Sequence, residues 1–291
     1  MFSSRRRVTG SPRRTATALG VLGAALALTV TTAGGATAAS GPSEDPVNIK
    51  PGQAYMGVGL KIHKGASAAG TGALAATDGV QGIDVSHWQG AIDWTSVRGA
   101  GIQFAWMKAT EGTGYKDPSF NTNYPAAYRA GVIRGAYHFA RPDVSGGATQ
   151  AGYFVGNGGG WSRDNLTLPG VLDIEHNPYG AMCYGLSTTQ MRTWINDFYT
   201  AYKSRTGRDV VIYTTASWWN TCTGNWTGMY GKSPLWVAHW GVSSPTLPSG
   251  FPTWTVWQYT ATGSVSGVSG NVDRNRFNGS RDRLLALANN T

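Results

Sequence analysis

Short apolar runs alternate with stretches of helical character along most of the chain. Eight runs of apolar or β-branched residues are candidates for buried strands, and they lie at 82–86, 102–109, 132–140, 168–175, 209–215, 234–240, 254–259 and 271–277. Short runs separated by helical stretches are typical of a sheet whose strands are joined by helices. Eight such units fit a β/α barrel, so we expect a single α/β domain.

The clearest helix is predicted for residues 188–206. Ser187 and Gln190 form a capping box before it, and Gly207 can take the left-handed conformation that ends a helix. Apolar residues recur at helical spacing, at Met191, Ile195, Phe198 and Tyr202. Residues 282–289 are expected to form a short terminal helix. The last third has few helical connections, so it should depart from a regular barrel.

The N-terminal part of the chain differs in pattern from the rest. Five arginines precede the apolar stretch "TALGVLGAALALTV", and a run of small residues ending in Ala36-x-Ala38 follows. This order predicts a secretory signal peptide at residues 1–38 and an extracellular protein. A transmembrane anchor is the rival interpretation, but the run is short and rich in Ala, Gly and Thr. We therefore expect no membrane anchor after the signal is removed.

Residues 39–77 are rich in Gly, Ala, Ser and Pro and show no sustained period. This composition predicts a flexible pro-segment or linker. All 12 tryptophans follow residue 80. The folded domain is therefore predicted to span residues 78–291.

The net charge bears on possible partners. It is formally +9, and the five arginines of the predicted signal carry +5, which leaves +4 on residues 39–291. A mildly basic exported protein is attracted to anionic polymers such as those of bacterial cell walls, although plain solubility is the simpler interpretation. Nucleic acid is a poor candidate, because Lys and Arg are scattered and accompany no nucleic-acid-binding motif.

The chain contains only two cysteines, Cys183 and Cys222. In an oxidising compartment an isolated pair predicts one disulfide, and the alternative is two buried free thiols. No Cys-x-x-Cys or His-x-x-x-His spacing indicates a metal site, so we expect neither metal nor cofactor.

Five of the thirteen acids after residue 77 lie at or beside the carboxyl ends of predicted strands. In a β/α barrel these strand ends line the active-site face, so acids found there are candidates for chemistry. The five are Asp84, Glu111, Asp173, Glu175 and Asp273.

Asp173 and Glu175 flank Ile174 at the end of one apolar run. On a strand, residues i and i+2 point to the same face. Two carboxyls in one cavity cannot both ionise cheaply, so the pKa of one should rise, giving a proton donor beside a carboxylate, as glycosidases require. The alternative is an ion-paired or N-capping pair at a strand-to-loop junction. The tripeptide alone favours that alternative, whereas Asp84 and Asp273 in similar settings favour chemistry.

Aromatic residues also gather near the predicted strand ends. Aromatic rings beside carboxylates and amides such as Gln258 make a plausible saccharide groove, and the alternative is that half of them pack the core. They are Trp106, Tyr137, Phe139, Tyr213, Trp236, Trp240, Trp257 and Tyr259. We expect Tyr137, Tyr213, Trp240, Trp257 and Gln258 to bind substrate.

No nucleophilic Ser or Cys is evident, because the chain has no Gly-x-Ser-x-Gly elbow and the cysteines are better used in a disulfide. Each of His87, His138, His176 and His239 is a weaker candidate for direct catalysis than the acids.

Seven stretches together resemble glycoside hydrolase family 25, the Chalaropsis-type lysozymes. In order along residues 80–291 they read "GIDVSHWQGAIDW", "KATEGTGYKDPSF", "GAYHFARP", "VLDIEHNP", "VIYTTASWW", "WVAHWG" and "WQYTATGSVSGVSGNVDRNRFNG". The resemblance implies an irregular, flattened β/α barrel. It also implies hydrolysis of the β-1,4 bond between N-acetylmuramic acid and N-acetylglucosamine in peptidoglycan, often including 6-O-acetylated muramic acid.

Matching motifs imply roles for single residues. Glu175 matches the general acid, and Asp173 and Asp84 complete the catalytic carboxylates. Asp273 matches a fourth family acid, and Glu111 matches an element whose part is structural or binding. Asp173 has three possible roles: attacking carbon, orienting the substrate's 2-acetamido group or activating water. We expect retention through the acetamido group, and a monomer.

Two other functions fit part of the pattern. A chitinase-like glycosidase also ends a strand in Asp-x-Glu, but its longer signature has further acids upstream that "LTLPGVLDIE" lacks. A wall-binding lectin would use the aromatic groove and leave the acids inert.

Overall fold

The computed structural model describes residues 49–64 and 79–291. The predicted signal peptide and the rest of the predicted linker lie outside this range. In the described part, nine strands form one sheet. They are β1 (Val80–Val85), β2 (Phe104–Glu111), β3 (Tyr115–Lys116), β4 (Ile133–Phe139), β5 (Val171–Asp173), β6 (Val211–Thr214), β7 (Leu235–Ala238), β8 (Val256–Gly263) and β9 (Val272–Phe277).

Eight of these strands close into a barrel. Their order is β1-β9-β8-β7-β6-β5-β4-β2, and pairing of β1 with β2 closes the ring, while the two-residue β3 extends the edge of β2. Neighbours are parallel except around β9, which runs antiparallel to both β1 and β8. The predicted barrel of about eight strands is confirmed, and the antiparallel β8–β9 pair is the irregularity expected in the last third.

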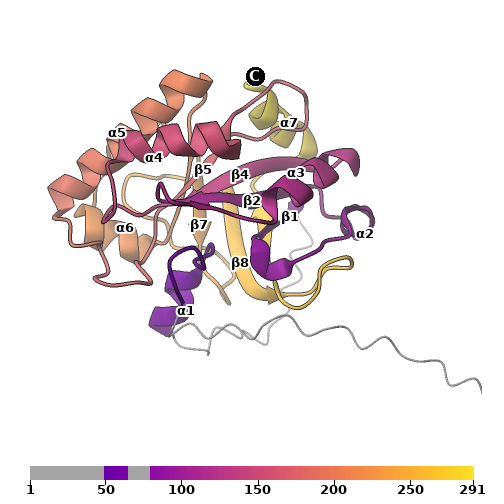
Figure 1. Cartoon of the computed structure of the whole chain (residues 1–291), viewed down its shortest axis with the longest axis horizontal. Helices are drawn as coiled ribbons and strands as arrows, with labels where there is room; N and C mark the ends of the chain where they lie inside the picture. The colour runs from indigo at the N-terminus through magenta and orange to yellow at the C-terminus, as the bar shows by residue number, and fades with distance from the viewer. Residues whose placement is uncertain (1–48, 65–78) are drawn as a thin grey trace, which may run out of the picture. The chain divides into compact units, whose positions relative to one another are not determined.

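Helices surround the barrel on the outside (Figure 1). The predicted 19-residue helix is confirmed as α5, with the Ser187 capping box and Gly207 at φ 71°. The helices are α1 (Val58–Lys64), α2 (Trp94–Gly99), α3 (Phe120–Arg129), α4 (Gly147–Phe154), α5 (Thr188–Thr206), α6 (Ala216–Thr223) and α7 (Arg281–Asn289), with short turns η2 (His87–Gln89) and η3 (Val155–Gly159). No helix of the described ranges is long and apolar enough to cross a bilayer.

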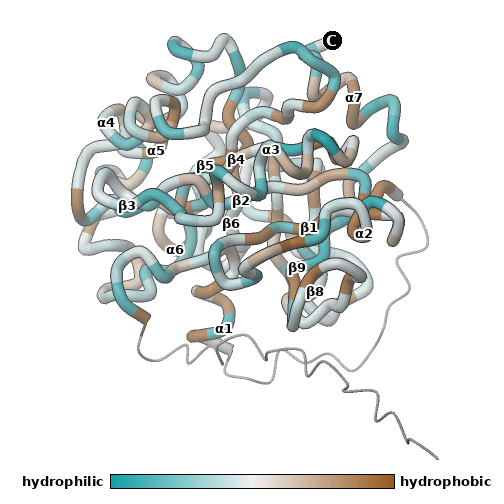
Figure 2. Tube along the Cα trace, turned by 45° about the vertical axis from the view of Figure 1, so that its right-hand side comes forward, coloured by the Kyte–Doolittle hydropathy of each residue, from teal (hydrophilic) through white to brown (hydrophobic). Residues whose placement is uncertain are grey.

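Side chains of the strands divide between two apolar clusters. Alternation along each strand sends one set outward, where it packs beneath the helices, and the other into the barrel. Figure 2 shows the hydrophobic stretches mainly in the interior and the hydrophilic ones mainly in outer loops. Trp106 and Trp236 fill the barrel interior with their ring centroids 4.7 Å apart, so these two aromatics are core residues.

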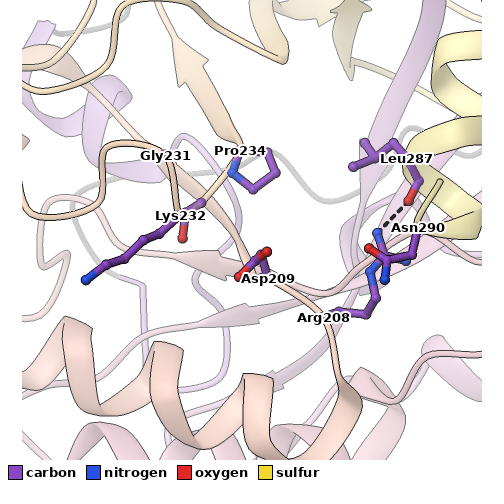
Figure 3. Close-up of a pocket in the computed structure, with 8 residues that line it drawn as sticks. Arg208, Asp209, Gly231, Lys232, Pro234, Leu287 and Asn290 are labelled. Atoms are coloured by element: carbon purple, nitrogen blue, oxygen red, sulfur yellow. Dashed lines mark hydrogen bonds between the residues drawn. The ribbon is translucent and has the colours of Figure 1, made fainter.

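Helix α7 closes the barrel at the amino ends of the parallel strands. Leu284 and Ala288 are buried in the interior cluster. Arg208 donates to the carbonyl oxygens of Leu287 and Ala288, which ties the last turn of α7 to the chain before β6. A pocket of about 260 Å³ lies at this end (Figure 3), and none of the five candidate acids lines it.

Residues 49–64, here named the covering segment, lie against the opposite end of the barrel (Figure 1). They belong to the stretch expected to be a flexible linker, yet they include α1 and bury Ala54, Met56 and Val58 completely. Their apolar residues follow no helical or strand period, which is why the pattern does not reveal them.

The predicted disulfide is present between Cys183, in the loop after β5, and Cys222 of α6, with 5.4 Å between their Cα atoms.

Candidate active site

All five candidate acids lie toward one end of the barrel, at the carboxyl ends of the parallel strands. Asp84 is near the end of β1, Glu111 ends β2 and Asp173 ends β5. Asp273 is on β9, directly across from Asp84, because the antiparallel β9 starts where β1 ends. Glu175 follows β5 by two residues rather than lying on the strand.

Asp84 is held by two side-chain amides inside the barrel. Its Oδ2 accepts hydrogen bonds from Gln258 Nε2 at 3.0 Å and from Asn275 Nδ2 at 2.7 Å. Burial raises its pKa to about 6, although these bonds and the positive charge of Lys61 favour the ionised form. Asp84 therefore changes charge near neutral pH.

Asp173 and Glu175 form a buried acidic pair. Burial is the main cause that raises the pKa of Asp173 well above its ordinary value, and repulsion from Glu175 is the next. A hydrogen bond between the two side chains favours the ionised form of Glu175. Burial also raises the pKa of Glu175, to about 8. The pair can therefore hold a proton at neutral pH, the requirement for an acid catalyst.

Two backbone groups of the covering segment bind Glu175. The N–H of Gly57 donates to Glu175 Oε1 at 2.7 Å, and the N–H of Gly59 donates to Oε2 at 2.9 Å. These bonds favour the ionised form, but burial outweighs them in setting the pKa.

Glu111 has a different environment. Its Oε2 accepts from Lys108 Nζ at 2.7 Å, and its Oε1 accepts from the Tyr179 hydroxyl at 2.9 Å and the Gly52 N–H at 2.9 Å. A carboxylate that accepts from this many donors holds those donors in place. These contacts suit a structural or binding part better than proton transfer.

Two predicted substrate-binding side chains, Tyr213 and Trp240, meet at a third, Gln258. Its Oε1 accepts from the Tyr213 hydroxyl at 2.7 Å and from Trp240 Nε1 at 3.0 Å, while its amide donates to Asp84. Tyr137 lies in the same region: burial raises the pKa of its phenol well above the ordinary value, and the charges of Asp84 and Asp173 add to this.

Trp257 lies elsewhere, contrary to the prediction. It falls between Val256 and Gln258, which point into the barrel, so its own side chain points outward. There its Nε1 donates to the carbonyl of His239 at 2.8 Å, and its ring packs edge-on to Trp254 and Tyr259. Trp257 supports the outer core and is not part of this group.

Two of the histidines occupy structural positions. His138 lies on the outer face of β4 between Thr110 and Gln150, and burial lowers its pKa to about 4. It is therefore neutral at physiological pH. His87 Nδ1 lies 3.1 Å from Asp117 Oδ2.

Sequence reasoning missed Asn275, Lys108 and Tyr179. Asn275 stands two residues after Asp273 on β9 and so shares its face, which is a usable signal. Lys108 precedes Glu111 by three residues, which regular alternation would place on opposite faces, and a register shift between Lys108 and Thr110 brings the two side chains together. Tyr179 lies in the irregular loop after β5, where no period could reveal it.

Comparison with known proteins accounts for this arrangement. The model of "Glycosyl hydrolases family 25" matches residues 83–268, most of the barrel. The chain belongs to this family. It is a glycoside hydrolase of the lysozyme, or muramidase, class.

Several family 25 proteins are matched over nearly their whole length. Lysozyme M1 of Streptomyces globisporus is 69% identical over 276 residues, covering 94% of this chain and 93% of the relative. The N,O-diacetylmuramidase of a Chalaropsis species is 43% identical over 213 residues, covering 72% and 99%. The crystal structure of the bacterial lysozyme from Streptomyces coelicolor has 77% sequence identity and a TM-score of 0.73, covering 74% of this chain and 99% of that one.

Proposed function

We propose that this chain is a secreted bacteriolytic N-acetylmuramidase. It hydrolyses the β-1,4 bond between N-acetylmuramic acid and N-acetylglucosamine in peptidoglycan, with Glu175 as general acid and Asp173 as its partner carboxylate. The supporting observation is the grouping of Glu175 and Asp173 at the strand ends of a family 25 barrel, where the charge of Asp84 also favours the protonated form of Glu175. A protonated carboxyl at neutral pH can protonate the glycosidic oxygen as the bond breaks.

The other site residues have distinct proposed roles. Asp173 accepts the N–H of the 2-acetamido group and orients its carbonyl oxygen toward the anomeric carbon, beside Glu175 at the end of β5. Asp84 supplies negative charge near the developing positive charge of the sugar. Asp273 lies across from Asp84 and supports it. Tyr137, Tyr213, Trp240 and Gln258 shape the groove around the sugar.

The proposed substrate includes muramic acid that carries a 6-O-acetyl group. Relatives from a Chalaropsis species and from Arthroderma benhamiae carry the name N,O-diacetylmuramidase, which supports this extension. Walls before and after mild removal of O-acetyl groups should both be lysed. The proposed partners are peptidoglycan and the anionic polymers associated with it, reached by a monomer exported through the predicted signal at residues 1–38.

The test compares Glu175→Gln with a control variant, Asp209→Asn, at the far end of the barrel. Both are assayed after the chain is cut at a specific protease site introduced between residues 65 and 78, because the covering segment contacts Glu175. Glu175→Gln should reduce lysis of bacterial walls by about 10²–10⁴-fold, the usual contribution of a general acid, and leave binding to insoluble walls intact. Asp209→Asn should lyse walls normally. Wild-type protein that binds walls without releasing reducing ends would point to a lectin, and greater activity on chitin than on walls would point to a chitinase.

The stereochemical course tests the role of Asp173. Attack by the acetamido group followed by water gives two inversions, so the freshly released reducing end should first appear as the β anomer by NMR. Initial appearance of the α anomer would replace this role with activation of water.

A further inference from the structure

The proposed general acid is inaccessible in the full chain. Glu175 is 1% exposed, and both of its oxygens are occupied by the N–H groups of Gly57 and Gly59. Asp84 and Asp173 are equally buried. An enzyme that cuts a polymer must bring its acid against a glycosidic oxygen, which cannot happen while these contacts persist.

The covering segment fills the apolar part of the site as well. Met56 and Leu60 belong to the interior cluster together with Tyr137, Tyr213 and Trp240, the aromatics proposed to bind sugar. Rings expected to face a ligand are instead covered by side chains of the same protein.

The backbone of residues 52–54 is bound through its polar groups. Lys108 Nζ donates to the carbonyl oxygens of Gly52 and Ala54, and Trp88 Nε1 donates to that of Gln53 at 2.8 Å. The N–H of Ala54 donates to the Tyr179 hydroxyl at 3.0 Å. Peptidoglycan also carries amide carbonyl and N–H groups, so these side chains offer the segment the kind of contacts that a wall fragment would use.

Glycine is required where the covering segment meets the acids. A Cβ atom on Gly59 would lie 2.8 Å from Glu175 Oε2 and 2.3 Å from His176 Cβ. A Cβ atom on Gly57 would lie 2.7 Å from Trp240 Cζ2, and its φ of +86° itself favours glycine. Charge is matched too, because Lys61 favours the ionised form of Asp84.

The barrel does not need this segment to be complete. The Chalaropsis relative is matched over 213 residues, 99% of its own length, which is no more than residues 79–291 supply. The family 25 match itself begins at residue 83, after the covering segment.

We propose that residues 49–64 are an intramolecular inhibitor that occupies the catalytic groove of the full chain and must leave before peptidoglycan can bind. This rests on the proposed function, since it takes Glu175 and its neighbours as the catalytic site. Tethering gives such a segment an effective concentration of about a millimolar, so a dissociation constant of about 10 µM would cover about 99% of the sites and slow lysis about 100-fold.

The first experiment uses the full chain with the specific protease site between residues 65 and 78. Lysis of suspended walls is measured before cutting and after cutting with removal of the N-terminal fragment by gel filtration. The rate should rise about 100-fold. Equal rates before and after cutting would overturn the proposal and leave the proposed function standing.

The second experiment expels the segment without cutting. Gly59→Leu places a side chain against Glu175 and should raise lysis by the intact chain toward the rate of the cut protein. Gly99→Leu is the matched control, because a Cβ atom on that helical glycine would meet nothing within 4 Å, and it should stay as slow as the wild type. No gain with Gly59→Leu, in protein whose circular dichroism is native, would contradict the proposal.

Calorimetry tests the contact without any assay of hydrolysis. A synthetic peptide of residues 49–64 should bind the cut and purified barrel, and the same peptide with Gly59→Leu should not. Absence of binding would overturn the inhibitor proposal. The peptide could bind while neither the cut protein nor the Gly59→Leu protein lyses walls. In that case the proposed function fails, and the contact between the covering segment and the barrel is still supported.

Discussion

The two ends of the barrel are closed in chemically different ways. Leu284 of α7 and Met56 of the covering segment are both fully buried in the same interior cluster, one at each end. At the α7 end, Arg208 satisfies backbone carbonyls and no candidate acid lines the nearby pocket. At the other end, N–H groups of the segment bind Glu175 and Glu111. A closure over apolar core stabilises the fold, whereas a closure over buried carboxyls blocks chemistry.

Truncating Leu284 and Met56, the buried residues at the two ends, should have the largest effects and should show which end stabilises the fold and which end blocks the site. Leu284→Ala leaves a cavity under a helix of the barrel itself, so the free energy of unfolding should fall by about 2–5 kcal/mol in urea titration. Met56→Ala weakens only the covering segment, so it should raise lysis by the intact chain and lower the free energy of unfolding by at most about 2.7 kcal/mol, the linkage limit for a segment docked at about 100 times its dissociation constant. Lysis by the intact chain that does not rise with Met56→Ala would erase the distinction between the ends.

Removing the disulfide should have the next largest effect on stability. The effect should be local to the end of the barrel that carries the candidate acids, here named the acidic end. Cys183 and Cys222 connect the loop that follows Glu175 to α6, with a sequence separation of 39. Replacing both cysteines by Ala should lower the free energy of unfolding by about 2–4 kcal/mol, because the unfolded chain regains loop freedom. Hydrogen exchange should increase in the loop after β5 and in α6, and not in α7. Uniform acceleration over the whole barrel would contradict a local role.

The contribution of Asp84 to the dependence of stability on pH should be the smallest effect, and it belongs to the acidic end. Asp84 and Glu175 have folded pKa values of about 6 and about 8, above the ordinary 3.8 and 4.5. Between about pH 4 and pH 8 the unfolded chain therefore releases these protons first, and their contribution to stability is lost as pH rises. Asp84→Asn should remove a part of this loss on the order of 1–3 kcal/mol, measured by urea titration at pH 4.5, 6 and 8. An unchanged pH profile would show that Asp84 titrates normally.

Much of the barrel was predictable because its strands are short, apolar and buried. All eight predicted strands are present, although Glu175 lies past the end of β5, where the apolar run continues into a loop. The two-residue β3 is too short to leave a pattern.

The site was less predictable, because its members come from distant parts of the chain. The acids were recognisable from their place after strands. The face on which Trp257 lies depends on the phase of alternation in β8, which an aromatic-rich stretch does not reveal. The covering segment is recognised only from its contacts, such as Gly59 against Glu175.

The most direct test of the central claim is mass spectrometry of fragments released from purified peptidoglycan by the cut protein. A muramidase that uses the acidic end of the barrel should release fragments with muramic acid at the reducing end, and Glu175→Gln should release almost none. Fragments ending in reducing glucosamine, or undiminished release by Glu175→Gln, would contradict it.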